Sequence, residues 1–163
     1  MSQWYLLDQQ RNGHPAQIET LLLPEAKLLH QIGWERNFNW ADVITDIRKG
    51  PPQKLIAIND NRIHGAISYR IDEGFVFIDL LESSPLNRRF ITPNREFTNV
   101  ADILIGQACL ISANSGFGGY VAFDAKTDLV SYYRKRFGAK SIGSQRMFIN
   151  EDSALDLIAL YYK

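Results

Sequence analysis

The sequence predicts an α/β protein with a mixed central sheet, in which an antiparallel meander leads into a strand–helix–strand–helix unit. Residues 54–81 hold three strand-like runs separated by short turns, the pattern of an antiparallel meander. Residues 99–138 then alternate helical and strand-like patterns, and two strands joined across a helix pair in parallel. The length of 163 residues is enough for one domain with a proper core.

Two short strands are expected at the start of the chain. Residues 3–8 (QWYLLD) and 17–23 (QIETLLL) are strand-like, and the loop between them contains the turn pair Asn12-Gly13. Pro24 is expected to end the second strand.

A helix is expected over residues 41–48, because Val43, Ile44 and Ile47 recur at helical spacing. Gly50-Pro51-Pro52 should end it, since proline breaks a helix.

The meander begins with a hairpin. Residues 54–58 (KLIAI) and 63–71 (IHGAISYRI) flank a polar turn over 59–62, whose residues tolerate left-handed backbone. Residues 74–81 (GFVFIDLL) are too apolar to have one wet face, so we expect a central strand.

The next helix should run from about residue 100 to 113. Asn99 is the expected N-cap, Asp102 stands at the third helical position as in a capping box, and Gly116 should stop the chain from continuing as helix. Its expected apolar face consists of Ile103, Leu104, Cys109, Leu110 and Ile111.

The remaining elements alternate. We expect a strand over 120–123, a helix over 128–137 that ends at Gly138, and a short strand over 147–149. Asp152 should cap a terminal helix, whose expected inner face is Leu155, Ile158, Ala159 and Tyr162.

Composition excludes several classes of function. The 18 basic and 18 acidic side chains cancel, which argues against a general binder of nucleic acid or anionic membrane. No apolar run approaches the roughly 20 residues of a membrane helix, and the first residues do not resemble a signal peptide, so we expect a cytoplasmic protein. A single cysteine, Cys109, most simply packed and inert, excludes an internal disulfide, and His14, His30 and His64 lack metal-ligand spacing, so no metal is expected.

One segment could bind an anion. Residues 97–101 lead into a helix start, where backbone N–H groups and the helix dipole favour phosphate, and Arg88, Arg89 and Arg95 lie just upstream. The alternative is that these arginines are simply solvated.

The order of elements over residues 54–150 resembles the GNAT family of acyl-coenzyme A-dependent N-acyltransferases. The segments that carry the resemblance are IAINDNRIHGAISY, FVFIDLLESSP, VADILIGQACLISA and YVAFDAKTDLVSYYRKRFGAKSI. The resemblance implies a single domain over 1–163, with an acceptor-side region at 1–53, the core at 54–150 and a terminal helix at 151–163.

The resemblance also implies acetyl-coenzyme A as co-substrate. The family's pyrophosphate loop falls on residues 96–101, where Glu96 replaces glutamine or arginine, Asn99 replaces a glycine, and Arg95 could compensate. Lys126 stands where the family often has an asparagine that touches the pantetheine arm. The implied cofactor-binding residues are Leu80, Leu81, Arg95, Phe97, Thr98, Asn99, Val100, Ala101 and Lys126.

For catalysis the resemblance implies direct attack of an amine on the thioester, with a base, a polarised carbonyl and an acid. Tyr133 is the implied acid, with Tyr132 as the alternate, although both could be core residues. Glu82 and Asp79 are the candidate bases, with a water chain as the alternative. Strand alternation puts these two carboxylates on opposite faces unless a bulge intervenes.

Two further groups have open interpretations. Trp34, Phe38 and Trp40 could line an acceptor pocket or belong to the core. The basic cluster could be a solvated helix end or could meet the 3′-phosphate of coenzyme A; it consists of Arg134, Lys135, Arg136 and Lys140.

The sequence is therefore interpreted as an N-acetyltransferase that acts on a small-molecule or peptide amine, with both a monomer and a homodimer left open. One alternative is a catalytically silent acyl-coenzyme A-binding module. Another is a toxin-like acetyltransferase of aminoacyl-tRNA, against which the zero net charge weighs, since nucleic-acid partners favour a basic face.

Overall fold

The computed structural model describes residues 2–88 and 94–163 of the chain. Its strands are Trp4–Leu7 (β1), Gly13–Thr20 (β2), Gln53–Ala57 (β3), Ile63–Ile71 (β4), Val76–Ser83 (β5), Val121–Asp124 (β6), Lys140–Ser141 (β7) and Arg146–Ile149 (β8). They form one eight-stranded sheet in the order β1-β2-β3-β4-β5-β6-β8-β7. Among the strands that the structure describes, only β5 and β6 pair in parallel, and the other neighbours are antiparallel. The predicted mixed sheet is confirmed.

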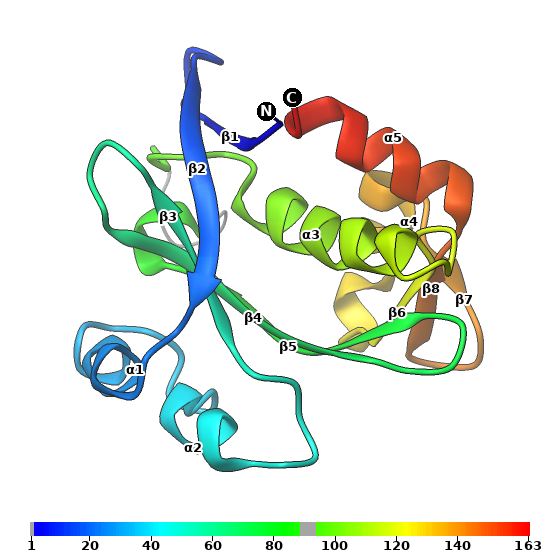
Figure 1. The fold of residues 1–163 in the computed structure, drawn as a ribbon, viewed down its shortest axis with the longest axis horizontal. Helices are drawn as coiled ribbons and strands as arrows, with labels where there is room; N and C mark the ends of the chain where they lie inside the picture. Colours follow the sequence, from blue (N-terminus) through cyan, green and yellow to red (C-terminus); the bar gives the residue numbers. More distant parts are fainter. Residues whose placement is uncertain (1, 89–93) are drawn as a thin grey trace.

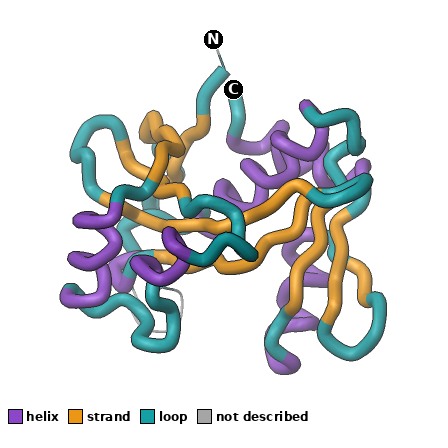
Figure 2. Tube along the Cα trace, turned by 60° about the horizontal axis from the view of Figure 1, so that its bottom comes forward, coloured by secondary structure: helices purple, strands orange, loops and turns teal. Residues whose placement is uncertain are grey.

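Helices cover both faces of this sheet. They are Leu23–Gln31 (α1), Trp40–Thr45 (α2), Val100–Asn114 (α3), Val130–Phe137 (α4) and Glu151–Tyr161 (α5), with 3₁₀ turns at Pro85–Asn87 (η1) and Thr127–Leu129 (η2). Helices α3 and α5 lie on one side of the strands, and α1 and α2 on the other (Figures 1 and 2). The two chain ends lie side by side, and Gln3 and Lys163 exchange backbone hydrogen bonds of 2.8 and 2.9 Å.

Strand β4 separates two buried clusters. Ile67 packs in the larger cluster, beneath α3 and α5, whereas its neighbour Ala66 packs in the smaller cluster with α1 and α2. Gly65 allows α3 to approach closely, because a Cβ there would lie 2.7 Å from Val100 Cγ1 and 2.9 Å from Leu104 Cδ1. This close contact fixes the amino end of α3 above the middle of the sheet.

Helix α1 was not predicted. Pro24 was expected to end a strand over 17–23, but the strand stops at Thr20 and Pro24 lies in the first turn of the helix. Proline is well tolerated there, since a first-turn N–H has no helical partner. Glu25 accepts a hydrogen bond from the Leu22 N–H at 3.0 Å and so helps the helix to start.

Helix α2 is shorter than predicted. Asn39 caps it by accepting hydrogen bonds from the N–H groups of Ala41 and Asp42, but the helix ends at Thr45 instead of continuing to residue 48. Ile47, expected on the apolar face, is 98% exposed. Asp46 has extended backbone, so the polypeptide leaves the helix before Ile47 can face the core.

The inner face of α5 is displaced from the prediction. Asn150 caps this helix through the N–H of Ser153 at 3.0 Å, in place of Asp152. Ala154 and Leu157 are the buried residues, and Leu155 is 47% exposed. Of the predicted face, Ile158 and Tyr162 are partly buried against the larger cluster. One residue of displacement turns a helix face by about 100°.

Within the described part of the chain, no helix has the length and apolar character needed to cross a membrane.

Candidate active site

The parallel pairing of β5 and β6 covers only the first part of β5, from Val76 to Ile78. Asp79 then forms a bulge, because Ile78 pairs with Tyr69 of β4 and Leu80 pairs with Ser68. A bulge leaves one residue unpaired and bends its strand. A cleft therefore opens between the carboxyl ends of β5 and β6.

The cleft has two connected parts. The first, about 350 Å³, lies between the strand ends and α4, and its lining includes Asp79, Leu80, Leu81, Lys126 and Tyr133. The second, about 370 Å³, extends to the first turn of α3, and its lining includes Glu82, Arg95, Thr98, Val100 and Ala101. Both parts share Phe38, Leu81, Lys126 and Leu129.

The amino end of α3 is open toward this cleft. Asn99 was expected to cap it, but its side chain faces strand β1, where Oδ1 accepts from the Leu7 N–H at 2.8 Å and Nδ2 donates to the Tyr5 carbonyl at 3.0 Å. Asn99 therefore stands at the predicted N-cap position, but its side chain does not make the cap hydrogen bond. No hydrogen bond is assigned to the N–H groups of Val100 and Ala101 within residues 2–88 and 94–163, and such free donors favour an anion.

Asp102 does not form the expected capping box either. Its buried carboxylate accepts a 2.6 Å hydrogen bond from Arg136 of α4 and a 3.1 Å one from the Tyr161 hydroxyl of α5. The hydrogen bond that Arg136 donates to Asp102 raises the pKa of Arg136. This cluster joins three helices and neutralises the carboxylate that lines the cleft beside α3.

The loop before α3 contributes only some of its predicted residues to the cleft. Arg95 lines the cleft. Phe97 is 4% exposed in the core, and its N–H donates to Asn87 Oδ1 at 2.8 Å. The Thr98 N–H donates to the Leu7 carbonyl at 2.9 Å, so neither N–H is available to a ligand. Arg89 of the predicted arginine group lies outside the described residues.

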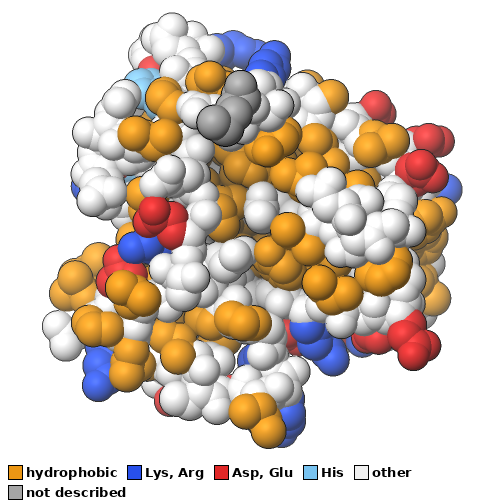
Figure 3. Space-filling view, in the orientation of Figure 1, with side chains coloured by type: hydrophobic (Ala, Val, Ile, Leu, Met, Phe, Trp, Pro, Cys, Tyr) orange, Lys and Arg blue, Asp and Glu red, His pale blue; other side chains and the backbone are white. Residues whose placement is uncertain are grey.

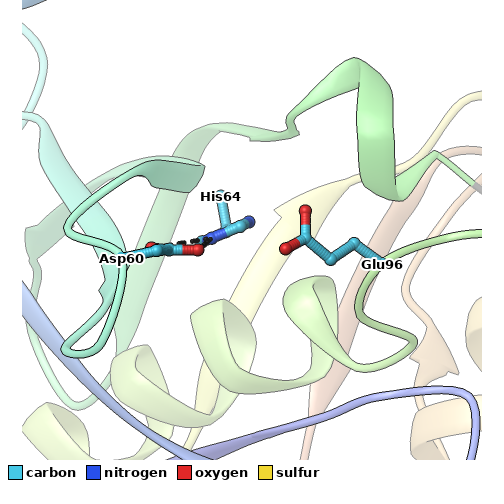
Figure 4. Close-up of side chains that lie close together, drawn as sticks. All are labelled: Asp60, His64 and Glu96. Carbon is cyan, nitrogen blue, oxygen red and sulfur yellow. Dashed lines mark hydrogen bonds and ion pairs between the residues drawn. The ribbon is translucent and has the colours of Figure 1, made fainter.

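Glu96, the poorest match to a phosphate loop, turns away from the cleft. Its carboxylate forms an ion pair with Arg62 in the turn between β3 and β4. It also lies near Asp60 and His64, with one ligand atom from each of the three residues within 4.8 Å of the others (Figure 4). Sequence patterns did not reveal this cluster, because Glu96 lies far along the chain from Asp60 and His64 and the three residues follow no motif.

The Asp60–His64–Glu96 cluster already contains its cation, because Arg62 also pairs with Asp60 at 2.9 Å. Asn87 fixes the tautomer of His64: its Oδ1 is engaged by Phe97, so its Nδ2 donates to His64 Nδ1 at 3.1 Å. The proton of neutral His64 is then on Nε2, which donates to Asp60 at 3.1 Å. In this tautomer Nε2 has no lone pair for a metal ion.

Tyr133 reaches the cleft from α4. Its ring contacts Phe123 edge-on, at 4.9 Å between centroids, and Tyr132 at 5.5 Å. Burial raises the pKa of the Tyr133 hydroxyl, as does the neighbouring Tyr132, so the hydroxyl is protonated at neutral pH. Tyr132 lines the second part of the cleft, beside α3.

The two candidate bases both bond to residues 33–50, which we call the acceptor-side segment because they lie in the predicted acceptor-side region 1–53. Asp79 accepts from the Gly50 N–H at 3.2 Å and from Arg70 at 3.1 Å. Glu82 accepts from the Glu35 N–H at 2.6 Å and from Trp40 Nε1 at 2.8 Å, and it pairs with Arg88. The bulge at Asp79 thus brings both carboxylates to the same side.

Burial raises the pKa of Glu82, although the hydrogen bonds from Glu35 and Trp40 and the charge of Arg88 oppose this shift.

The three aromatic residues of the acceptor-side segment divide between two roles. Trp34 and Trp40 are 3% and 1% exposed and pack in the smaller cluster. Phe38 lines both parts of the cleft.

A separate cavity, about 510 Å³, lies between α1, the β3–β4 turn and η1. Its walls are mostly apolar and include Leu28, Leu29, Ile32 and Trp34. Hydrophobic side chains also show on the surface around α1 (Figure 3), where Leu28 and Ile32 are 53% and 57% exposed. None of the predicted catalytic or cofactor-binding residues lines this cavity, although Trp34, one of the three candidate aromatic residues, does.

No protein-family model and no curated protein sequence matches the chain. Solved structures do match it. A spermidine N-acetyltransferase, the SpeG chimera from Vibrio cholerae and hSSAT, has a TM-score of 0.60 at 10% identity, over 86% of this chain and 98% of that chain. The PaiA N-acetyltransferase from Thermoplasma acidophilum, in complex with coenzyme A, has a TM-score of 0.55 at 12% identity, over 83% and 99% of the two chains. AAC(6′)-Ib, in complex with paromomycin and acetyl-coenzyme A, has a TM-score of 0.56 at 9% identity, over 85% and 94%.

Proposed function

We propose that this chain, whose fold is that of the GNAT N-acyltransferases, is an N-acetyltransferase that transfers an acetyl group from acetyl-coenzyme A to an amine of a small molecule or peptide. The observation that carries the proposal is the continuous cleft from Tyr133, between the ends of β5 and β6, to the open amino end of α3. The matched structures support it, since two of them contain coenzyme A or acetyl-coenzyme A.

The residues in the cleft fit the parts of acetyl-coenzyme A. The N–H groups of Val100 and Ala101, at the positive end of α3, would receive the pyrophosphate, with Arg95 beside them. The edge of β5 at Leu80 and Leu81 would face the pantetheine arm, opposite Lys126. Acetyl-coenzyme A supplies the thioester, which would then lie in the part of the cleft that contains Asp79 and Tyr133.

Tyr133 is the proposed general acid. A protonated hydroxyl in this part of the cleft can give its proton to the departing thiolate. Asp79 would accept a hydrogen bond from the incoming ammonium and orient it, and the proton that the amine must lose would pass to solvent water.

The departures from the family's phosphate loop at Glu96 and Asn99 give little support to a catalytically silent acyl-coenzyme A-binding module. Their side chains face Arg62 and strand β1 instead of the cleft. The aminoacyl-tRNA alternative loses support too, because Arg88 and Arg136 of the basic groups are paired with Glu82 and Asp102.

Thiol release tests the proposal. The protein is mixed with acetyl-coenzyme A and each of a set of amines (polyamines, aminoglycosides, amino acids and short peptides), and free coenzyme A is measured with a thiol reagent. We expect amine-dependent release with at least one acceptor and an acetylated amine by mass spectrometry. Binding of coenzyme A without release for any amine would support the silent module instead.

A further inference from the structure

Glu82 lies in the wall of the cleft, but its carboxylate oxygens are already engaged. Oε1 accepts from the indole Nε1–H of Trp40 at 2.8 Å, and Oε2 accepts from the Glu35 backbone N–H at 2.6 Å. Oε2 also pairs with the Arg88 guanidinium. The Glu82 side chain is only 4% exposed, so an acceptor amine has little access to it.

These bonds close a short loop. Glu35 and Trp40 stand at the two ends of this loop and donate to the same carboxylate. Within the loop, the Phe38 N–H donates a 3.1 Å hydrogen bond to the Glu35 carbonyl and so forms a turn. Phe38, between the two anchored residues, lines both parts of the cleft. The position of Phe38 over the cleft therefore depends on Glu82.

We propose that Glu82 is a positioning residue, which holds the 35–40 loop and places Phe38 as a wall of the acceptor site, and that it is not the catalytic base. Burial favours a proton on Glu82, but the three donors oppose it, and a protonated Glu82 would have to give up at least one of these bonds. The proposal rests on the proposed function only where it concerns the acceptor, because the anchoring itself is a property of the fold.

Asp79 holds the other end of the same segment. It accepts from the Gly50 N–H at 3.2 Å, and Ser68 Oγ donates to the Gly50 carbonyl at 2.7 Å. A Cβ on Gly50 would lie 1.5 Å from the Tyr69 carbonyl oxygen, so only glycine allows this close approach to β4. The acceptor-side segment is thus hydrogen-bonded to the sheet near both of its ends, and Phe38 lies in the 35–40 loop that bonds to Glu82.

Hydrogen exchange of the backbone amides tests the anchoring without any substrate. Trp40→Phe removes the indole donor and leaves the carboxylate, and Glu82→Gln cannot accept from all three donors. We expect both variants to exchange the amides of residues 35–40 about tenfold faster than the wild type, the effect of losing one such bond, while α3 and β4 are unchanged.

Trp34→Phe is the matched control. It replaces a second buried tryptophan of the same cluster by the smaller phenylalanine, and the indole of Trp34 makes no hydrogen bond to Glu82. The amides of residues 35–40 should therefore exchange near the wild-type rate in this variant. Equal exchange in wild type, Trp40→Phe and Glu82→Gln would overturn the proposal, whether or not the protein binds acetyl-coenzyme A.

Kinetics with an acceptor found by thiol release separates positioning from proton abstraction. If Glu82 positions Phe38, Trp40→Phe and Glu82→Gln should both raise the acceptor KM, by about tenfold for one lost bond, and both should keep the wild-type pH profile of kcat. If the pH profile of kcat loses its acidic limb in Glu82→Gln but keeps that limb in Trp40→Phe, Glu82 is a base and the proposal is overturned.

Discussion

Tyr133 and Tyr132 are adjacent in the sequence, yet they face different parts of the cleft. Tyr133 lines the part between the strand ends, where Asp79 lies, and Tyr132 lines the part beside α3. The sequence analysis could not separate these two tyrosines, because both lie on the apolar side of one helix. Their different surroundings give them different expected effects on the reaction.

We expect Tyr133→Phe to lower kcat by about 100-fold, the scale of a lost general acid. The affinity for coenzyme A should change little, because the ring remains and only the hydroxyl is removed. Steady-state kinetics and calorimetric titration of coenzyme A check the two quantities, with Tyr132→Phe as the control. A normal kcat in Tyr133→Phe would remove Tyr133 from the mechanism.

His64 gives a prediction for stability against pH. Burial lowers the pKa of His64 below its usual value of 6.5, and the opposing bond to Asp60 does not cancel this effect. The His64 imidazole therefore binds a proton more readily in the unfolded chain than in the folded protein. Neutral His64 contributes fully to the free energy of unfolding above about pH 6.5, and this contribution is lost as the pH falls below that value.

Urea unfolding at pH 7.5 and at pH 5.5 measures this contribution. The free energy of unfolding of the wild type should decrease on acidification, and His64→Gln should show a smaller decrease, because glutamine does not titrate. The same pH dependence in both proteins would contradict the neutral His64 assigned from the Asn87 hydrogen bond.

At the scale of elements, the hydrophobic periodicity of the sequence predicted most of the strands, but it did not predict the side-chain hydrogen bonds and ion pairs between elements. The expected strand over 63–71 agrees with β4, and the left-handed Gly138, at φ 65°, ends α4 as expected. Helix α1 was missed because Pro24 can either end a strand or begin a helix. The cleft residues on β5 and α4 could be placed through the family resemblance, but the targets of the Asn99 and Glu96 side chains depend on contacts with distant strands and turns.

The Asn99 side chain connects the start of α3 to strand β1, so its removal should lower the stability of the protein. Asn99→Ala leaves the Leu7 N–H and the Tyr5 carbonyl without their partner, so we expect a loss of about 1–3 kcal/mol in the free energy of unfolding. Coenzyme A affinity should stay within about twofold, since a side chain outside the cleft adds no direct binding energy. Asn150→Ala, the loss of a true cap, should cost about 0.5–2 kcal/mol.

Denaturant unfolding and coenzyme A titration of the two variants test this assignment. A large loss of coenzyme A affinity in Asn99→Ala with unchanged stability would mean that Asn99 faces the ligand.

At the scale of the whole molecule, the cleft is assembled from distant parts of the chain. Strand β5, the amino end of α3, helix α4 and the 35–40 loop each contribute one wall. A zero net charge gives no general attraction for a phosphate ligand, so the proposed binding of coenzyme A depends on the local donors at α3. The central claim is therefore that this particular helix end holds the cofactor.

Ala101→Glu tests this claim by placing a carboxylate at the second position of α3. An acidic residue in the first turn favours the helix itself, so the fold should persist while phosphate binding is lost. Asn114→Glu introduces the same residue at the exposed other end of α3 and serves as the control.

The measurement we would make first is thermal unfolding of these proteins with and without coenzyme A and acetyl-coenzyme A. A ligand at about 100 times its Kd adds about 2.7 kcal/mol of stability, which for a domain of this size raises Tm by about 5–10 °C. We expect this rise in the wild type and in Asn114→Glu, and none in Ala101→Glu. No rise in the wild type at millimolar ligand, or an undiminished rise in Ala101→Glu, would contradict the account.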